Sequence, residues 1–413
     1  LLCQLGPGSL DETFDGDGVA TLDIAGTDRA NAVALQSDGK IVVAGTTTAG
    51  NNDFAVARFN ANGSLDTSFG SGGKVTTDIG SSSFDEAAAV IVQPDGKIVV
   101  AGTSVNNFAV VRYNSNGTLD TSFGKKGKVT TDFSNGAADR GRALAIQSDG
   151  KLVVAGRSST VSLSTGGLFA VARYTTSGKL DTSFSGDGKV TTNVGSSSTS
   201  VDDGAGALII QADGRIVAGG SADWHPDGNP DGTFALVRYN TNGSVDSSFG
   251  SGGQVITAIG AGSGIFELAL QSNGKIIAAG YSGGTDNESN SAFALARYNV
   301  DGTLDTSFDT DGIVTTEIGA GGDRASGVGL QTDGKIVAAG DSHNGTNFDS
   351  ALVRYNSDGS LDTSFDSDGI VTTAIGTGDD AFRGLVIQPD GQIVVAGESR
   401  QTNIDFTAAR YCA

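Results

Sequence analysis

One short element recurs seven times along this chain of 413 residues, and it constrains the fold more than any other feature. The element reads Leu or Val, Asp, any residue, Ser or Thr, and Phe, and its copies begin near residues 10, 65, 119, 180, 245, 304 and 361. Two other elements recur in step with it, Gln-x-Asp/Asn-Gly and Arg followed by Tyr or Phe. A repeat of this kind folds as one supersecondary unit that packs against its neighbours.

Each copy has the pattern of four short strands. In the second copy these are AAAVIVQ (87–93), KIVVAGT (97–103), FAVVRYN (108–114) and KVTTDF (128–133). The turn PDG separates the first two strands, and its Gly suits the positive φ of a tight hairpin. The 63 Gly residues fit such a turn-rich chain. The sequence therefore predicts an all-β fold: one domain over residues 1–413, a seven-bladed β-propeller of four-stranded antiparallel blades.

The two ends of the chain complement each other. The last copy stops at Ala413 without its fourth strand, and residues 18–24 near the N-terminus have the sequence of that strand. We expect them to pair with the C-terminal blade and so close the ring. Cys3 and Cys412 would then meet, which predicts a disulfide and an oxidising compartment. The chain begins at Leu1, so we expect that a leader has been removed.

The repeated segments LDTSFGSGGKVTTDIG, AVIVQPDGKIVVAG and FAVVRYNSNG resemble the delta-60 repeat, a β-propeller repeat of bacterial secreted and surface proteins. The resemblance covers essentially the whole chain. It implies a propeller with an extracellular or cell-surface location. It implies no shared activity and no shared catalytic residues.

Charge and hydropathy exclude some partners. The formal net charge is −21, and such a surface repels the phosphates of nucleic acids. No segment approaches the ~20 apolar residues that a membrane-spanning helix needs.

The repeated residues are expected to build the scaffold. One Arg per blade can reach the Asp of the recurring element, which would give seven ion pairs, and the Phe of that element can wedge between blades. Binding residues are therefore expected where the copies differ. The loops between second and third strands differ most, and they contain Trp224, His225 and His343, our candidate ligand-binding residues.

Acidic residues near the starts of the first strands suggest two further kinds of site. Asp85, Asp202 and Asp379 are candidates for paired-carboxylate catalysis on a polysaccharide. Four other acids are candidate calcium ligands if they gather at the mouth of a central channel: Asp28, Asp139, Asp203 and Asp323. The alternative for those followed by Arg, at 28, 139 and 323, is a solvated pair with that Arg.

The sequence favours a secreted, non-enzymatic recognition or structural propeller that binds glycan or an extracellular protein and requires no cofactor. A polysaccharide hydrolase or lyase and a calcium-stabilised extracellular scaffold remain as alternatives.

Overall fold

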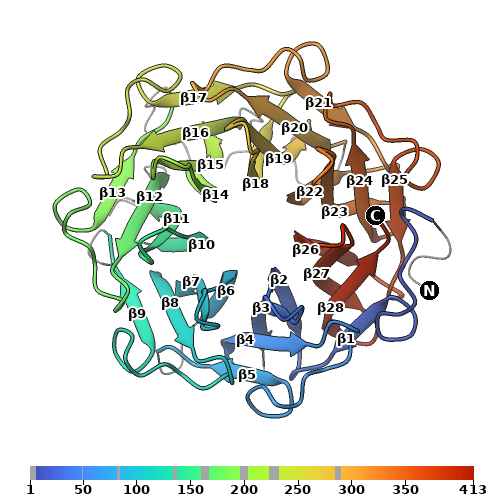
Figure 1. The fold of residues 1–413 in the computed structure, drawn as a ribbon, viewed down its shortest axis with the longest axis horizontal. Coiled ribbons are helices and arrows are strands. Elements are labelled where there is room, and N and C mark those ends of the chain that lie inside the picture. Colours follow the sequence, from blue (N-terminus) through green and yellow to red (C-terminus); the bar gives the residue numbers. More distant parts are fainter. Residues whose placement is uncertain are drawn as a thin grey trace. The chain divides into compact units, whose positions relative to one another are not determined.

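The computed structural model describes residues 6–48, 50–80, 84–133, 136, 138–159, 167–195, 203–222, 232–283 and 290–413. These residues form strands and turns, and no helix occurs among them. The strands make seven four-stranded antiparallel sheets, which are the blades of a β-propeller (Figure 1). The predicted fold class is confirmed.

The strands of blades 1 to 4 follow the chain. Blade 1 is β2 (Asp28–Leu35), β3 (Ile41–Thr48), β4 (Asn52–Phe59) and β5 (Lys74–Thr77); blade 2 is β6 (Asp85–Val92), β7 (Ile98–Ser104), β8 (Asn107–Tyr113) and β9 (Lys128–Thr131). Blade 3 is β10 (Asp139–Ile146), β11 (Leu152–Ser159), β12 (Gly167–Tyr174) and β13 (Lys189–Thr192); blade 4 is β14 (Gly204–Ile210), β15 (Ile216–Ala222), β16 (Thr233–Tyr239) and β17 (Gln254–Thr257).

The last three blades continue this order until the chain ends. Blade 5 is β18 (Ser263–Leu270), β19 (Ile276–Ser282), β20 (Ala292–Tyr298) and β21 (Ile313–Thr316); blade 6 is β22 (Asp323–Leu330), β23 (Ile336–His343), β24 (Phe348–Tyr355) and β25 (Ile370–Thr373). Blade 7 is β26 (Asp380–Ile387), β27 (Ile393–Arg400), β28 (Ile404–Tyr411) and β1 (Val19–Leu22).

The chain divides into two compact units. One contains Leu1–Val99, Tyr113–Thr118 and Ile318–Ala413, and the other contains Val100–Arg112 and Leu119–Glu317. Each unit is described by itself below.

Blade 7 joins the two ends of the chain within the first unit. β1 pairs antiparallel with β28, with Val19 opposite Ala409 and Leu22 opposite Phe406. This is the pairing that the sequence predicts, and it covers the edge of β28 that would otherwise be open.

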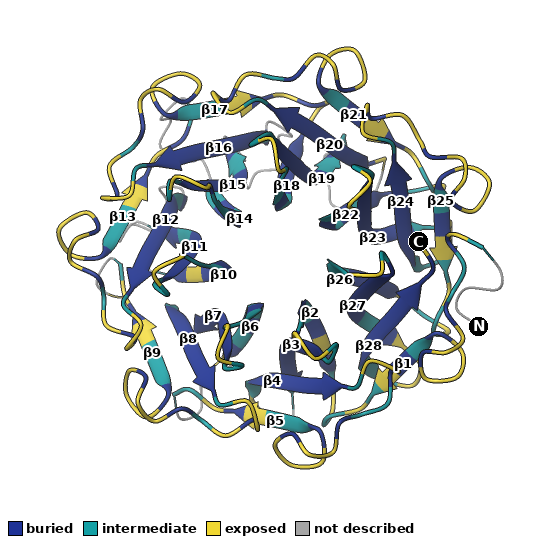
Figure 2. Ribbon diagram, in the orientation of Figure 1, coloured by how far each residue is buried: buried dark blue, intermediate teal, exposed yellow. Residues whose placement is uncertain are grey.

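Burial follows the order of strands in each blade. The second and third strands are buried on both faces, as in β3 and β4, and each contains a continuous apolar run, IVVA in β3 and FAVA in β4 (Figure 2). The fourth strand is only partly covered, and its sequence alternates accordingly, as in β5 (KVTT).

The repeated Asp, Arg and Phe form one unit in each blade. In blade 1, Arg58 Nε donates to Asp66 Oδ2 at 2.8 Å, and its guanidinium lies 4.6 Å from the ring centroid of Phe69. Asp66 Oδ1 accepts from the backbone N–H of Ser68 at 3.1 Å, which caps the following turn. Arg58 also donates to the carbonyl oxygen of Ser115 in blade 2 at 2.5 Å. All seven predicted ion pairs are present.

A β-bulge interrupts the first strand of each blade except blade 2, whose register is not described. In blade 1, Ala30 lies opposite Gly45 and Ala32 opposite Ala44, so Asn31 is the extra residue. A Cβ added to Gly45 would overlap the carbonyl oxygen of Arg29 and lie 2.8 Å from Ala30 Cα. The bulge therefore explains why the second strand carries Ala-Gly at this place.

Candidate functional site

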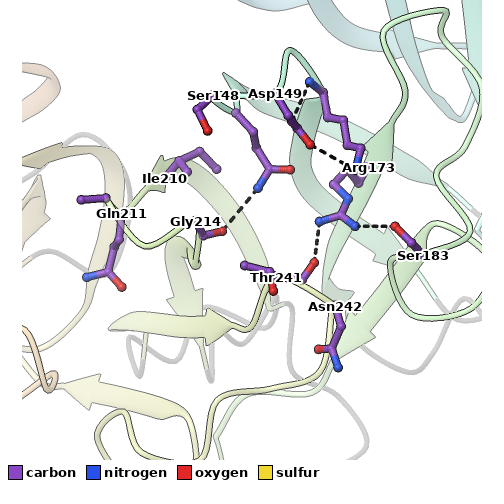
Figure 3. Close-up of a pocket in the computed structure, with 12 residues that line it drawn as sticks. Ser148, Asp149, Arg173, Ser183, Ile210, Gln211, Gly214, Thr241 and Asn242 are labelled. Atoms are coloured by element: carbon purple, nitrogen blue, oxygen red, sulfur yellow. Dashed lines mark hydrogen bonds and ion pairs between the residues drawn. The ribbon is translucent and has the colours of Figure 1, made fainter.

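The two ends of a blade differ in how strictly their sequences repeat. We call the end with the Gln-x-Asp/Asn-Gly hairpin the turn end, and the end where the second strand passes to the third the variable end. A pocket of ≈ 570 Å³ lies at the turn end between blades 3 and 4 (Figure 3).

This turn-end pocket is built from residues that recur in the other blades. Gln147 Nε2 donates to the carbonyl oxygen of Gly214 at 3.3 Å, and Arg173 donates to that of Thr241 at 2.5 Å. Gln147 and Gln211 both belong to the recurring hairpin element. We therefore assign the pocket to the joint between blades.

The acids at the starts of the first strands are buried, and they bind backbone rather than solvent. Asp28, Asp85, Asp139, Asp203 and Asp323 are all 0% exposed. Their Oδ2 atoms accept from backbone N–H groups just after the fourth strand of the preceding blade: Ile24 at 2.5 Å, Ile79 at 2.7 Å, Phe133 at 2.7 Å, Val194 at 3.1 Å and Ile318 at 2.8 Å.

This burial differs from the solvated pairing with Arg that the sequence allowed for Asp28, Asp139 and Asp323. Burial raises the pKa of Asp139 and Asp323, although hydrogen bonds oppose the shift. One such acid lies at the start of the first strand in each of these blades. We therefore explain its position by its structural role, in which it holds two neighbouring blades together.

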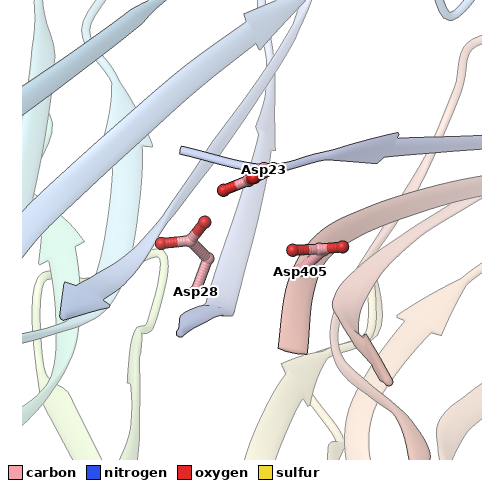
Figure 4. A group of neighbouring side chains, drawn as sticks. All are labelled: Asp23, Asp28 and Asp405. Atoms are coloured by element: carbon pink, nitrogen blue, oxygen red, sulfur yellow. The ribbon is translucent and has the colours of Figure 1, made fainter. Parts of the chain in front are cut away.

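Among the described residues, two other acids gather around Asp28. Carboxylate oxygens of Asp23, Asp28 and Asp405 lie within 4.8 Å of one another, and the three side chains point toward a common centre (Figure 4). Burial, followed by the charges of Asp23 and Asp28, raises the pKa of Asp405. A second group of the same size contains Asp53, Asp78 and Asp85.

The remaining sequence candidates are dispersed. Asp379 is exposed, and its Oδ1 accepts from the N–H of Phe348 at 3.2 Å. His343 ends β23, its ring lies 4.9 Å from that of Phe348, and its Nδ1 accepts from the N–H of Gly345 at 3.2 Å. Trp224, His225 and Asp202 lie outside the described residues.

Three positions at the variable end differ from blade to blade although the strands around them repeat. They are the residue after the buried acid (after the buried Ser263 in blade 5), the bulge residue, and the residue after the second-strand Gly; we call them the variable triplet. In blades 1, 3, 4, 5, 6 and 7 the triplets are Arg29/Asn31/Thr46, Arg140/Arg142/Arg157, Gly204/Gly206/Ser221, Gly264/Phe266/Tyr281, Arg324/Ser326/Asp341 and Ala381/Arg383/Glu398.

In the first unit, the triplets of three blades share one chain of ion pairs. Arg324 donates to Asp341 at 2.7 and 3.0 Å, and Arg383 lies 3.4 Å from the other oxygen of Asp341. Arg383 also contacts Glu398 at 3.2 Å, and Glu398 in turn contacts Arg29 at 3.0 Å. Opposite charges thus alternate from blade 6 through blade 7 to blade 1.

This chain of ion pairs ends at a cleft of ≈ 130 Å³ between blades 1 and 2. Phe84, with 54% of its surface exposed, lines the cleft. Thr46 is 7% exposed, and its Oγ1 has no hydrogen-bond partner among the described residues. The polar lining is completed by Thr27, Arg29, Asn31, Thr48, Asn52 and Glu86. The cleft therefore combines an exposed ring with closely spaced donors and acceptors.

Sequence reasoning missed these positions because it compared loops between the copies and not single strand positions. The signal is present in the sequence. Aligned on Asp-x-Ala and Ala-Gly-x, the copies show variable residues inside otherwise repeated strands.

Comparison with protein families identifies the chain. The family described as "Domain of unknown function (DUF5122) beta-propeller" matches residues 36–69, 93–123, 147–184, 211–249, 271–308, 331–365 and 388–411. The protein belongs to this family of β-propeller repeats. The finer assignment to the delta-60 repeat stays a prediction.

Among solved structures, U3-55K agrees with this chain in fold alone. U3-55K is similar with a TM-score of 0.53 and 12% identity, over 96% of this chain and 98% of that chain. A protein of unknown function from Dyadobacter fermentans is similar with a TM-score of 0.49 and 12% identity, over 95% and 97%. A search of the curated proteins found none that matches. No described helix has the length and apolarity needed to cross a membrane.

Proposed function

We propose that this protein is an extracellular, non-enzymatic recognition propeller, and that the cleft between blades 1 and 2 binds a glycan. The observation that carries the proposal is the combination of exposed Phe84 with the buried, unpartnered hydroxyl of Thr46 in one cleft. A large exposed aromatic ring and an unsatisfied buried hydroxyl each cost free energy in the unbound protein, so a ligand that covers both would recover that cost.

A sugar fits the chemistry of this lining. The apolar C–H face of a sugar ring can pack on Phe84, as apolar groups pack on aromatic rings. Its hydroxyl groups both donate and accept, and they match Thr46, Asn31 and Glu86. The size of the cleft suits one residue of a chain rather than a buried small molecule.

Two substitutions test this cleft. Phe84→Ala should weaken binding of oligosaccharides from a neutral glycan panel by about tenfold, because the packing surface is removed. Thr46→Val should weaken binding by about fivefold. Since Thr46 Oγ1 is unpartnered without ligand, the same change should leave the melting temperature equal or higher. Titration calorimetry and thermal melts measure both.

Ile256→Ala, which shortens an exposed side chain on β17, is the matched control and should change neither quantity. If both cleft variants bind glycan as tightly as wild type, the glycan site lies outside this cleft. A panel in which no oligosaccharide binds would overturn the proposal.

A polysaccharide hydrolase or lyase is the second candidate, and one residue favours it. Burial raises the pKa of Glu267 on β18 to about 7, a value suited to a general acid or base. The predicted acids Asp85 and Asp379 instead accept backbone N–H groups. Incubation with polysaccharides should release reducing ends or unsaturated uronates only if this candidate is correct, and Glu267→Gln should then abolish the release.

A calcium-stabilised scaffold is the third candidate, favoured by the group of Asp23, Asp28 and Asp405. The like charges that raise the pKa of Asp405 would be neutralised by a divalent cation with oxygen ligands. If calcium binds, millimolar calcium should raise the melting temperature above that in chelator, and Asp405→Asn should remove this response. Identical melts in calcium and chelator would exclude the candidate.

A further inference from the structure

Blade 3 has arginine at all three positions of its variable triplet. Arg140 on β10 lies directly opposite Arg157 on β11, and Arg142 is the bulge residue of the same strand. Arg140 and Arg142 are exposed, while their neighbours Gly141 and Ala143 are buried. Like charges directly opposite each other destabilise a pair of strands, so this arrangement has a cost within the fold.

The same positions in blade 6 show that the scaffold does not require this cost. There Arg324 lies opposite Asp341, and the two form hydrogen bonds of 2.7 and 3.0 Å. Arg140, in contrast, makes no ion pair with any described residue. In a chain of net charge −21, three arginines on one pair of strands form a local positive surface.

The neighbouring blade presents no side chain at two positions beside these arginines. Its triplet has Gly204 and Gly206, which carry no side chain. A Cβ added to Gly204 would lie 3.2 Å from Arg157 Cβ and 3.5 Å from Arg157 Cδ, so the stem of Arg157 lies across Gly204. A Cβ added to Gly206 would lie 2.9 Å from the carbonyl oxygen of Ile265 in blade 5. The two glycines therefore let blade 4 pack closely against Arg157 on one side and against the blade 5 backbone on the other, and we call these two positions, which carry no side chain, the bare strip.

An aromatic pair stands at the far side of this strip. The rings of Phe266 and Tyr281 lie 5.4 Å apart with an angle of 31° between their planes. Both residues belong to the blade 5 triplet, and both are partly exposed. In no other described triplet is there an aromatic residue. Arginines, a bare strip and an aromatic pair thus follow one another across blades 3, 4 and 5 of the second unit.

We propose that this surface, formed by the triplets of blades 3 to 5, binds an anionic polysaccharide. Guanidinium groups form paired hydrogen bonds with carboxylate or sulfate oxygens. The polysaccharide chain would pass over the bare strip and the stem of Arg157 that crosses it, and a sugar ring would pack on Phe266 or Tyr281. The site is separate from the cleft at Arg29 and Phe84 and goes beyond the function proposed there.

The test uses the full chain and four probes: polygalacturonate, dextran sulfate, neutral dextran and single-stranded DNA. Wild-type protein should bind at least one of the two anionic polysaccharides, more weakly as salt increases, and should bind dextran and DNA at least tenfold more weakly. The double substitution R140Q/R142Q should weaken anionic binding at least tenfold. Phe266→Ala should weaken it by about fivefold.

The matched control is K125Q/K126Q, which removes two exposed cations from the turn end of blade 2. Its affinity should stay within about twofold of wild type, since only the general charge of the protein changes. If R140Q/R142Q and K125Q/K126Q lose the same amount of affinity for the anionic polysaccharides, the effect comes from net charge alone and the proposal is wrong. DNA binding as tight as polysaccharide binding, or no binding of either anionic polysaccharide, would also overturn it.

The two proposed sites fail independently. If Phe84→Ala loses neutral glycan binding but keeps anionic polysaccharide binding, the first site is supported. The second site is then tested by R140Q/R142Q alone. Preference between polygalacturonate and dextran sulfate identifies carboxylate or sulfate as the recognised group.

Discussion

At the scale of single residues, two sets of aspartates that look alike in sequence have opposite surroundings. Asp66 and its counterparts meet a buried Arg, as their fixed spacing from that Arg predicts. Asp139 and its counterparts accept backbone N–H groups from the preceding blade. The sequence could not predict the second role, because it depends on how one blade packs on the next, and the Arg that follows Asp139 suggested a simpler partner.

The ion-paired set should determine the response to acid. Burial alone would raise the pKa of Asp181, but hydrogen bonds from Ser183 and Lys151 and the charge of Arg173 outweigh it and lower the pKa to about 2. A carboxyl with a lowered pKa stabilises the fold above its unfolded pKa of about 4, and this contribution is lost as pH falls toward 2. Asp11, Asp66, Asp246, Asp305 and Asp362 shift in the same direction.

We therefore expect the melting temperature to change little between pH 5 and pH 8 and to fall steeply below pH 4. Asp181→Asn should lower the melting temperature at pH 7, and its difference from wild type should shrink as pH falls from 4 to 2. The exposed Asp309→Asn serves as control. A difference for Asp181→Asn that stays constant down to pH 2 would contradict this account.

At the scale of strands, the sequence predicted much of each blade and missed one feature. Period, turn residues and β-branched runs predict the four strands and the Gln-x-Asp/Asn-Gly hairpin. The bulge in the first strand was not predicted, because a bulge is defined by register against the second strand, and register is set by tertiary packing. Since Asn31, Arg142 and Phe266 are bulge residues, missing the bulge meant missing candidate site residues.

The bulge makes a sharp prediction for the glycine opposite it. Gly45→Ala should destabilise the fold by about 3 kcal/mol, because the new Cβ meets backbone atoms of Arg29 and Ala30 that cannot rotate away. Gly204→Ala is the matched control, since its Cβ would mainly meet the side chain of Arg157, which can shift. Denaturant unfolding measures both. Equal losses of stability would show that the bulge does not require glycine.

At the scale of the whole molecule, the seven copies act as an internal comparison. Positions shared by the copies build the Arg–Asp–Phe units and the buried acids, and positions that differ gather at the variable end. Net charge is a poor guide at this scale: a chain of net charge −21 still carries three arginines in the triplet of blade 3. The residues that repeat in the copies determine the fold, and the positions that differ between the copies form the candidate sites.

The joining of the two chain ends leads to the last prediction, which concerns Cys412. Its N–H donates to the carbonyl oxygen of Ser9 at 2.9 Å, and its carbonyl oxygen accepts from Gly8 at 3.0 Å. The side chain of Cys412 is buried. Cys3 lies outside the described residues, but it is only five residues before Gly8, which is within reach of an extended chain. We therefore expect the predicted disulfide to form.

A disulfide across nearly the whole chain should stabilise the protein by about 2–4 kcal/mol, because it restricts the unfolded state. Intact mass without reductant should be lower by two hydrogens than after reduction. Reduction should lower the melting temperature of wild type, whereas Cys412→Ser should melt at that lower temperature with or without reductant. If the unreduced, unfolded protein instead reacts with a thiol reagent at two sites, both cysteines are free thiols and the disulfide prediction is wrong. The two ends are then joined only by the backbone pairing of β1 with β28.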